Sequence, residues 1–288
     1  MKTLLLMFLT IFTSQTDTLK NRIASRMSAV EGTMAMAFHD LTTGDQILIN
    51  EREMFHAAST MKTPVMIELF RQADEGMIRL NDSLIVKNSF KSIVDGSTYS
   101  MDLSDDSDDS MYGMIGARMT LRDLVYQMIT VSSNLAANIL IEVVDAKKVT
   151  AMMRALGADS IQVLRGVEDL KAYEAGLNNR TNAYDLMLAF KALAEGAAAS
   201  PRACEIMIDI LDDQKFRDLI PSQLPPEVRV AHKTGSITGV EHDSGIIFLP
   251  DGRRYVLVVL SKDLKDRNQG KKAIGDISKM LYEHVTGR

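Results

Sequence analysis

Ser59 and Lys62 form a pair of residues whose types and spacing suit nucleophilic chemistry. Ser59-Thr60-Met61-Lys62 precedes a helical pattern, so we expect Ser59 at a helix N-terminus, beside unpaired backbone N–H groups and the positive end of the helix dipole. Lys62 follows one turn later, which places its amine on the same face as the hydroxyl. A serine needs a base to become a nucleophile, and a desolvated lysine can be that base. Alone the pair is weak evidence, because a chain of this size contains Ser-x-x-Lys about once by chance.

Two later segments carry residues of a related kind. Thr130-Val131-Ser132-Ser133-Asn134 lies between two apolar helical patterns, and capping of the second helix would by itself explain its polar residues. Lys233-Thr234-Gly235-Ser236 is expected on a strand. A lysine and a hydroxyl there, followed by a glycine without a side chain, suit a substrate carboxylate, although any surface strand that ends in a turn could carry them.

Together the three segments follow the order Ser-x-x-Lys, Ser-Asp-Asn and Lys-Thr-Gly, the signature of class A β-lactamases and penicillin-binding proteins. The longer stretches 59–64, 128–138 and 232–236 resemble these proteins too. Glu174-Ala175-Gly176-Leu177-Asn178 is similar to the Glu-x-x-Leu-Asn of the Ω-loop of class A enzymes. The chain therefore resembles class A β-lactamases and their serine-hydrolase relatives, in collinear order over nearly everything after its first residues.

The resemblance implies a reaction and a role for each residue. Ser59 would attack the lactam carbonyl and form an acyl-enzyme. Lys62 and Glu174 would share removal of its proton, directly or through a water. Ser132 would relay a proton to the leaving nitrogen, and Glu174 would activate the water that releases the acyl group. The backbone N–H groups of Ser59 and Ser236 would form the oxyanion hole. The substrate-binding residues implied by the resemblance are Asn134, Asn178, Lys233, Thr234, Gly235 and Ser236.

The sequence departs from the family pattern in three places. Ser133 stands where the family has Asp, which predicts a rearranged loop or lower stability. The loop after Asn178 is short and lacks the Asp that would pair with Arg165. A short loop would move Glu174 away from its water, and Glu168 is then the fallback base. The distal arginine of the substrate carboxylate has three candidates, Arg253, Arg254 and Arg267.

The function predicted is a β-lactamase acting through a serine acyl-enzyme. The alternatives are a penicillin-binding DD-peptidase or esterase of the same fold with slow deacylation and, more distantly, a non-enzymatic binding protein of the cell envelope. A zinc hydrolase is disfavoured because the five histidines form neither His-x-His nor His-Glu-x-x-His. Gly-x-Ser-x-Gly is absent, which disfavours a Ser-His-Asp hydrolase. His232 and His242 flank the Lys-Thr-Gly segment, either as cleft residues or, more simply, as structural ones.

The surrounding elements must bring these segments together. Alternating residues predict a hairpin over 32–49 and a second over 245–260, and a last helix over 271–284. Between the hairpins helical periodicity dominates, over 65–75, 121–128, 135–144, 149–156 and 183–195, with start signals at Thr120 and at Thr181 or Asn182. We therefore expect an α+β fold of the β-lactamase/transpeptidase type. Its antiparallel sheet is flanked by N- and C-terminal helices and interrupted by an all-α insertion.

The expected organisation is one catalytic domain, 19–288, built from two subdomains with the ligand site in the cleft between them. Residues 19–60 and 221–288 form the α/β subdomain, and 61–220 form the all-α subdomain. Lys2, the apolar run 3–12 and the polar residues 13–16 predict a signal peptide over 1–18; a buried N-terminal helix or strand of a cytosolic protein is the alternative.

Net charge, cysteine count and acidic residues indicate which partners and ions the chain is suited to bind. The formal net charge of −5 gives no basic face for nucleic acid, and one cysteine excludes an intramolecular disulfide. The acidic segment 102–110 lacks the glycine and the late glutamate of a calcium-binding EF-hand, so a solvated loop is the simpler interpretation. We expect a monomer that takes a small β-lactam substrate and uses no metal or organic cofactor. We expect it in the periplasm or outside the cell, without membrane insertion after signal removal.

Overall fold

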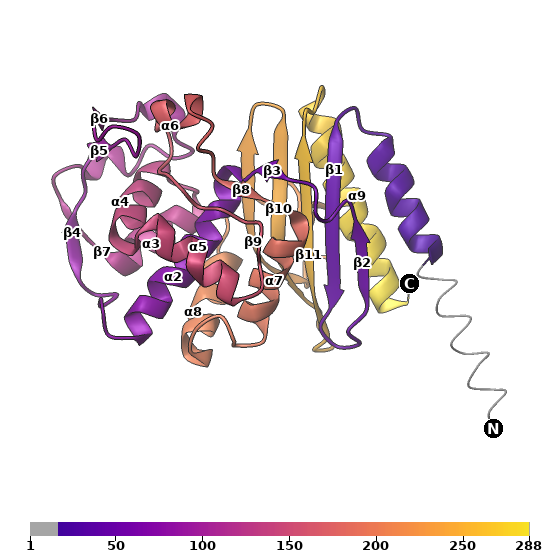
Figure 1. Cartoon of the computed structure of the whole chain (residues 1–288). Helices are drawn as coiled ribbons and strands as arrows, with labels where there is room; N and C mark the ends of the chain where they lie inside the picture. Colours follow the sequence, from indigo (N-terminus) through magenta and orange to yellow (C-terminus); the bar gives the residue numbers. More distant parts are fainter. Residues whose placement is uncertain (1–16, 288) are drawn as a thin grey trace.

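A five-stranded antiparallel sheet forms the centre of the protein, whose computed structural model describes residues 17–287. The strand order is β2-β1-β11-β10-β9, so the first and last parts of the chain pair with each other (Figure 1). Both predicted hairpins are confirmed. The strands are β1 (Thr33–Asp40), β2 (Gln46–Ile49), β9 (Arg229–Ile237), β10 (Val240–Phe248) and β11 (Arg254–Lys262).

The sheet is covered on both faces, and two hydrophobic cores result. Alternate residues of β1 enter different cores: Met36 and Phe38 pack with the helix over 17–28 and with α9 (Arg267–Thr286), whereas Ala35 and Ala37 pack with the helical part. Successive side chains of a strand point to opposite faces, so a strand covered on both sides becomes apolar throughout. The flanking N- and C-terminal helices of the expected α+β fold are confirmed (Figure 1).

The stretch between the hairpins contains the five predicted helices and one further long helix, α8. They are α2 (Lys62–Asp74), α3 (Leu121–Thr130), α4 (Asn134–Val144), α5 (Ala146–Ala155), α7 (Ala183–Ala194) and α8 (Pro201–Asp212). The caps follow the sequence signals, because the side chains of Thr120 and Asn182 accept hydrogen bonds from the first turns of α3 and α7.

Helices dominate this stretch, as expected for the insertion, and short strands are present between them. It contains two short antiparallel ladders, and a third joins it to the segment before Ser59. The strands are β4 (Ser83–Ile85) with β7 (Arg118–Thr120), β5 (Phe90–Lys91) with β6 (Thr98–Tyr99), and β3 (Phe55–His56) with β8 (Arg180–Thr181). Such two- and three-residue strands leave no readable period-2 pattern. The subdomain boundaries at 60/61 and 220/221 stay a prediction.

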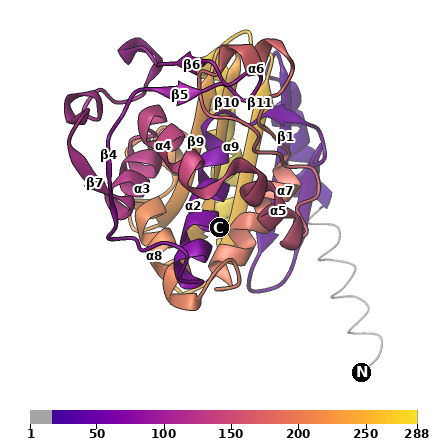
Figure 2. The same ribbon diagram turned by 60° about the vertical axis from the view of Figure 1, so that its left-hand side comes forward.

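The remaining helices are short and lie around the site. They are η1 (Ala58–Met61), η2 (Leu103–Asp105), η3 (Tyr112–Met114), α6 (Leu170–Glu174) and η4 (Ile220–Gln223). In both ribbon views β5, β6 and α6 gather at one end of the helical part (Figures 1 and 2). Contacts confirm this: Lys171 of α6 pairs with Asp95, in the turn between β5 and β6.

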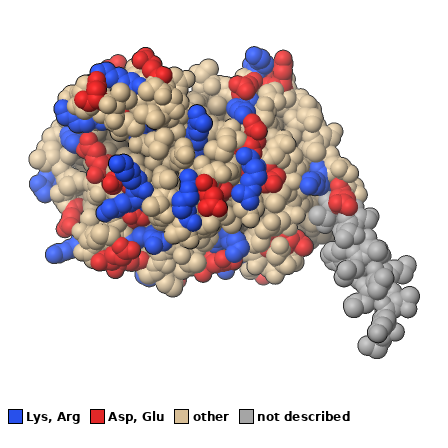
Figure 3. Space-filling view, in the orientation of Figure 1, with Lys and Arg blue, Asp and Glu red and all other residues tan. Residues whose placement is uncertain are grey.

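Sixteen residues of the predicted signal peptide, 1–16, lie outside the described residues. None of the helices within residues 17–287 has the length and apolar character needed to span a bilayer. On the face seen in Figure 3, basic and acidic side chains alternate rather than separate into one-sign fields.

Candidate active site

A cavity of about 380 Å³ lies between the sheet and the helical part, next to Ser59. Five segments that are far apart in the sequence form its walls. Its lining residues are His56, Ala58, Ser59 and Met61; Ser104, Asp105, Asp106 and Ser107; Asn134; Arg165, Val167, Glu168, Leu170, Tyr173 and Asn179; and Ser236 and Ile237.

Ser59 belongs to η1, which runs directly into α2. The backbone N–H of Lys62 donates to the carbonyl of Ser59, so the serine and the lysine are separated by one helical turn, as predicted. Ala58, which precedes the serine, has a φ of 45°. Left-handed backbone is unfavourable for a residue with a Cβ and is found at functional sites where the surrounding structure imposes it.

The Lys62 amine is fully buried and is held by the turn between α3 and α4. It donates to the carbonyl of Ser132 at 2.6 Å, to the hydroxyl of Ser132 at 3.2 Å and to Oδ1 of Asn134 at 2.7 Å. Ser132 has a φ of 59°, and this conformation turns both its carbonyl and its hydroxyl toward the lysine. Ser133, its neighbour, caps α4 by accepting from Ala136 N. The capping function and the catalytic position therefore belong to two different serines.

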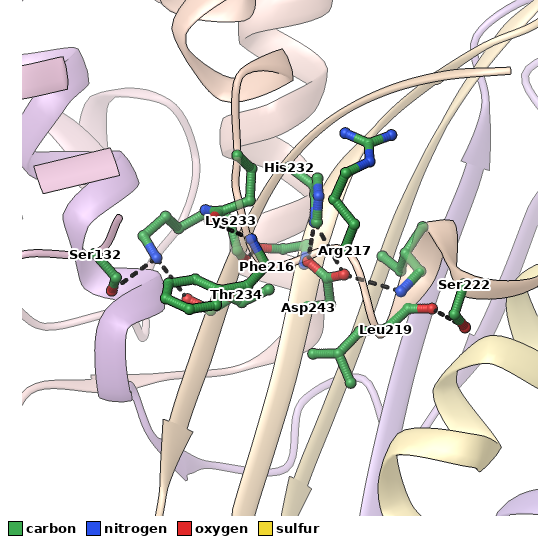
Figure 4. Close-up of polar contacts among 12 residues, drawn as sticks. Ser132, Phe216, Arg217, Leu219, Ser222, His232, Lys233, Thr234 and Asp243 are labelled. Atoms are coloured by element: carbon green, nitrogen blue, oxygen red, sulfur yellow. Dashed lines mark hydrogen bonds and ion pairs between the residues drawn. The ribbon is translucent and has the colours of Figure 1, made fainter. Parts of the chain in front are cut away.

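A second buried amine reaches the same hydroxyl. Lys233 of β9 donates to Ser132 Oγ at 3.0 Å and to the carbonyl of Thr234 at 2.9 Å (Figure 4). Burial lowers the pKa of Lys62 to about 7, although the negative charge of Asp106 opposes the shift. Burial and then the nearby Lys62 lower the pKa of Lys233, against the opposing charge of Asp243. A neutral amine beside Ser132 is therefore accessible near neutral pH.

Gly235 lets β9 pass directly against the nucleophile's helix. A Cβ at this position would lie 3.1 Å from Thr60 N and 3.2 Å from Ser59 N. Contacts this close are tight, so a larger residue would push β9 away from η1. This close approach, which the sequence did not predict, brings Ser236 to the edge of the cavity.

Of the three candidate arginines, Arg267 is the one beside the Lys-Thr-Gly strand. Its guanidinium donates to Ser236 Oγ at 2.6 Å and pairs with the buried carboxylate of Glu241. Arg254 begins β11 opposite Phe248, at the other end of the sheet, and Arg253 pairs with Asp251 in the adjacent turn.

Glu174 does not line the cavity of Ser59. It ends α6 with an exposed side chain. Asn178 is also outside the lining, and its Oδ1 accepts from Arg165 Nη2 at 3.0 Å. The expectation that Glu174 and Asn178 hold a water beside Ser59 stays a prediction, and this arrangement does not support it. The Glu-x-x-Leu-Asn match placed them in the loop but could not give the direction of their side chains.

Glu168, the fallback, lines the cavity instead. It has a φ of 59°, and its side chain is half-buried. Burial and then the charge of Asp105 raise its pKa, while Arg165 opposes the shift. A carboxylate with a raised pKa at the edge of a nucleophile's cavity has the environment of a general base.

Comparison with known proteins agrees with this geometry. The family model described as Beta-lactamase enzyme family matches residues 18–285. The chain belongs to this family.

Individual relatives agree with the assignment. A β-lactamase of Bacteroides uniformis is 24% identical over 303 residues, covering 98% of this chain and 99% of the relative. The crystal structure of a β-lactamase from Sphaerobacter thermophilus is 29% identical with a TM-score of 0.78, covering 92% of this chain and 97% of that one. The structure of PBP-A is 25% identical with a TM-score of 0.80, and the match covers 94% of this chain and 97% of PBP-A. The resemblance to class A β-lactamases and their relatives is confirmed.

The Ω-loop of this family member, residues 165–179, is closed without the family's Arg–Asp pair, whose Asp the sequence lacks. Arg165 donates instead to the carbonyls of Gly166 and Leu177 at 3.0 and 3.2 Å. Asn179 replaces the missing carboxylate: its Oδ1 accepts from Leu164 N and Arg165 N at 2.8 and 3.1 Å, and its Nδ2 donates to Arg165 O at 3.0 Å. Asn179 belongs to no recognisable motif. Its role in closing the loop follows only from its position, where the two ends of the loop meet.

His232 and His242 are structural. Both are fully buried and neither lines the cavity of this β-lactamase-family chain. His232 Nδ1 lies 2.9 Å from Asp243 Oδ1 (Figure 4). The His242 ring receives Ser261 N–H at Nδ1, so its Nε2–H donates to the carbonyl of His56 at 2.9 Å. His242 thus ties the sheet to the segment before Ser59.

Proposed function

We propose that this chain is a serine β-lactamase of the class A type, which opens the β-lactam ring through an acyl-enzyme on Ser59. The observation that carries the proposal is the hydrogen-bonded cluster of Lys62, Ser132 and Lys233, which lies one helical turn from Ser59 in the wall of the cavity. Its first step needs a nucleophile, a buried base and a proton relay, and these residues supply all three. No step requires a metal or an organic cofactor.

Acylation follows from the two amines that share Ser132. Neutral Lys62 takes the proton of Ser59, whose Oγ then bonds to the lactam carbonyl carbon while the backbone N–H groups of Ser59 and Ser236 stabilise the oxyanion. As the ring C–N bond breaks, Ser132 Oγ gives its proton to the leaving nitrogen, and the Lys62 ammonium replaces it. Lys233 and Thr234 bind the substrate carboxylate, with Arg267 beside them, and Asn134 holds the side-chain amide.

Deacylation is assigned to Glu168 rather than to Glu174. Its carboxylate removes a proton from a water, and the water oxygen attacks the ester carbonyl. Ser59 Oγ then leaves as the C–O bond breaks and takes that proton back from Glu168. The support is the position of Glu168 in the cavity lining and the raised pKa of its carboxyl.

Mass spectrometry of the intact protein with benzylpenicillin tests the function. We expect a transient mass increase of one penicillin, followed by return to the free mass with release of hydrolysed product. The variant Ser59→Ala should show neither adduct nor turnover. An adduct that persists for many minutes would favour the penicillin-binding DD-peptidase or esterase, and no adduct on the wild-type protein would contradict the proposal.

We also propose that the protein is exported to the periplasm or the medium and acts as a monomer. The support is the charged and apolar pattern of residues 1–18, which resembles a signal peptide. N-terminal sequencing of the protein from periplasmic extract or medium should find a start near residue 19. Light scattering should give a mass near that of one chain. An unprocessed N-terminus in the cytosol would contradict export.

A further inference from the structure

The carboxylate of Asp106 is bound to the N-terminus of α4, although the acidic segment 102–110 was expected to be solvated. Asp106 Oδ1 accepts from Asn134 N at 2.7 Å, and Oδ2 accepts from Leu135 N at 3.0 Å and from the Ser133 hydroxyl at 3.4 Å. A carboxylate here satisfies two backbone N–H groups of the first turn and complements the helix dipole. Asp106, from the acidic segment 102–110, therefore holds the turn at the start of α4 in place.

That turn carries the groups that hold Lys62. The Ser132 carbonyl and hydroxyl and Asn134 Oδ1 are its three hydrogen-bond partners. Asn134 Nδ2 donates to the carbonyl of Asp105 at 2.7 Å, so the acidic segment holds both the backbone and the amide of Asn134. Because Ser132 has a positive φ, the turn needs such contacts to keep its conformation.

Asp106 also acts through its charge. Its negative charge favours the protonated form of the Lys62 amine and opposes the effect of burial. The other charged groups on this side of the cavity are Asp105 of the same segment, Arg165 and Glu168 of the Ω-loop, and Lys233 of β9, backed by Asp243 of β10. Lys233 donates to Ser132 Oγ, and Asp106 is the acidic side chain that contacts the turn directly.

We propose that Asp106 is a positioning residue of the acylation step, which holds the Ser132–Asn134 turn against Lys62 and sets the pH range in which Lys62 acts as the base. The inference rests on the proposed function. A carboxylate reaches this turn from a separate segment, at a position where residue 133 is a serine rather than the family's Asp.

The pH dependence of kcat/KM for benzylpenicillin, from about pH 5.5 to 9, tests the proposal, because it reports the pKa values of the free enzyme. The wild-type acid limb should lie near pH 7, the pKa of Lys62. In Asp106→Asn loss of the negative charge lowers that pKa, so the acid limb should move down by roughly one pH unit. The maximum should fall about 10-fold, and in Asp106→Ala about 100-fold, since the turn is released.

Asp109→Asn is the matched control, because Asp109 belongs to the same segment and is exposed. It should keep the wild-type profile. If Asp106→Asn lowers the melting temperature but leaves the acid limb and the maximum at their wild-type values, the role is structural and the inference is overturned. Absence of any acylation in the wild type would instead overturn the proposed function and this inference with it.

Discussion

At the scale of single residues, the site depends on two lysines that share one hydroxyl. Lys62 and Lys233 both donate to Ser132 Oγ, and both amines are fully buried. Two like charges in a low-dielectric environment disfavour each other, so one amine is readily neutral while the other keeps its proton. The neutral one can accept the proton of Ser59, and the charged one can attract the substrate carboxylate.

Single-residue variants also test whether Glu168 or Glu174 is the base that releases the acyl group. Glu168→Gln should keep acylation and slow deacylation by about 10²–10³-fold, because the attacking water loses its base. Glu174→Gln should hydrolyse benzylpenicillin at nearly the wild-type rate, since its side chain is exposed at the end of α6. Time-resolved mass spectrometry of the adduct measures both variants. Accumulation of the acyl-enzyme in Glu174→Gln alone would reverse the assignment.

At the scale of elements, the start of α4 separates stability from catalysis. Ser133 accepts from Ala136 N and caps the helix, whereas Ser132 presents its hydroxyl to the two amines. Ser132 has a positive φ, and the two neighbouring hydroxyls bind different partners.

Paired alanine variants test this division. Ser133→Ala should lose about 1 kcal/mol of unfolding free energy, because the cap of α4 is lost. Its kcat/KM should change less than that of Ser132→Ala. Ser132→Ala should lower kcat/KM about 10²-fold or more through loss of the proton relay, with little change in stability. Urea unfolding and steady-state kinetics on both proteins give the comparison. Equal effects of the two variants on kcat/KM would argue against separate roles.

At the scale of the whole molecule, the sheet joins two cores and carries buried polar groups between them. His242 is one of these, and its Nε2 hydrogen bond to His56 connects β10 with the segment before the nucleophile. Burial lowers the pKa of His242 to about 4, so the ring is neutral in the folded protein at neutral pH. The unfolded chain, with a histidine pKa of about 6.5, takes up the proton first as the pH falls.

This linkage predicts acid sensitivity. Stability should fall as the pH drops from about 6.5 toward 4, because the unfolded state binds more protons over that window. His242→Gln should be less stable than wild type at pH 7, yet it should lose about 2 kcal/mol less between pH 7 and 5. Urea unfolding at the two pH values measures the difference. An identical loss in both proteins would show that another group controls the acid limb.

Local sequence patterns were enough to predict the main elements and the central motifs. The hairpins follow from alternation and the long helices from their period, and Ser59, Lys62, Ser132 and Lys233 were predicted from short motifs. These features depend on neighbours in the chain, so the sequence by itself determined them. Two- and three-residue strands such as β3 and β8 lack such a pattern and were missed.

The tertiary structure alone decided the residues whose role depends on loop conformation. Glu168 rather than Glu174 lines the cavity, Asn179 closes the Ω-loop, and Asp106 reaches α4 from an acidic segment that looked solvated. The direction of a side chain on an irregular loop is set by backbone angles and distant hydrogen bonds, which leave no periodic trace in the sequence. The sequence by itself therefore determined the helices, the hairpins and the motifs. Long-range packing determined which loop side chains reach the site.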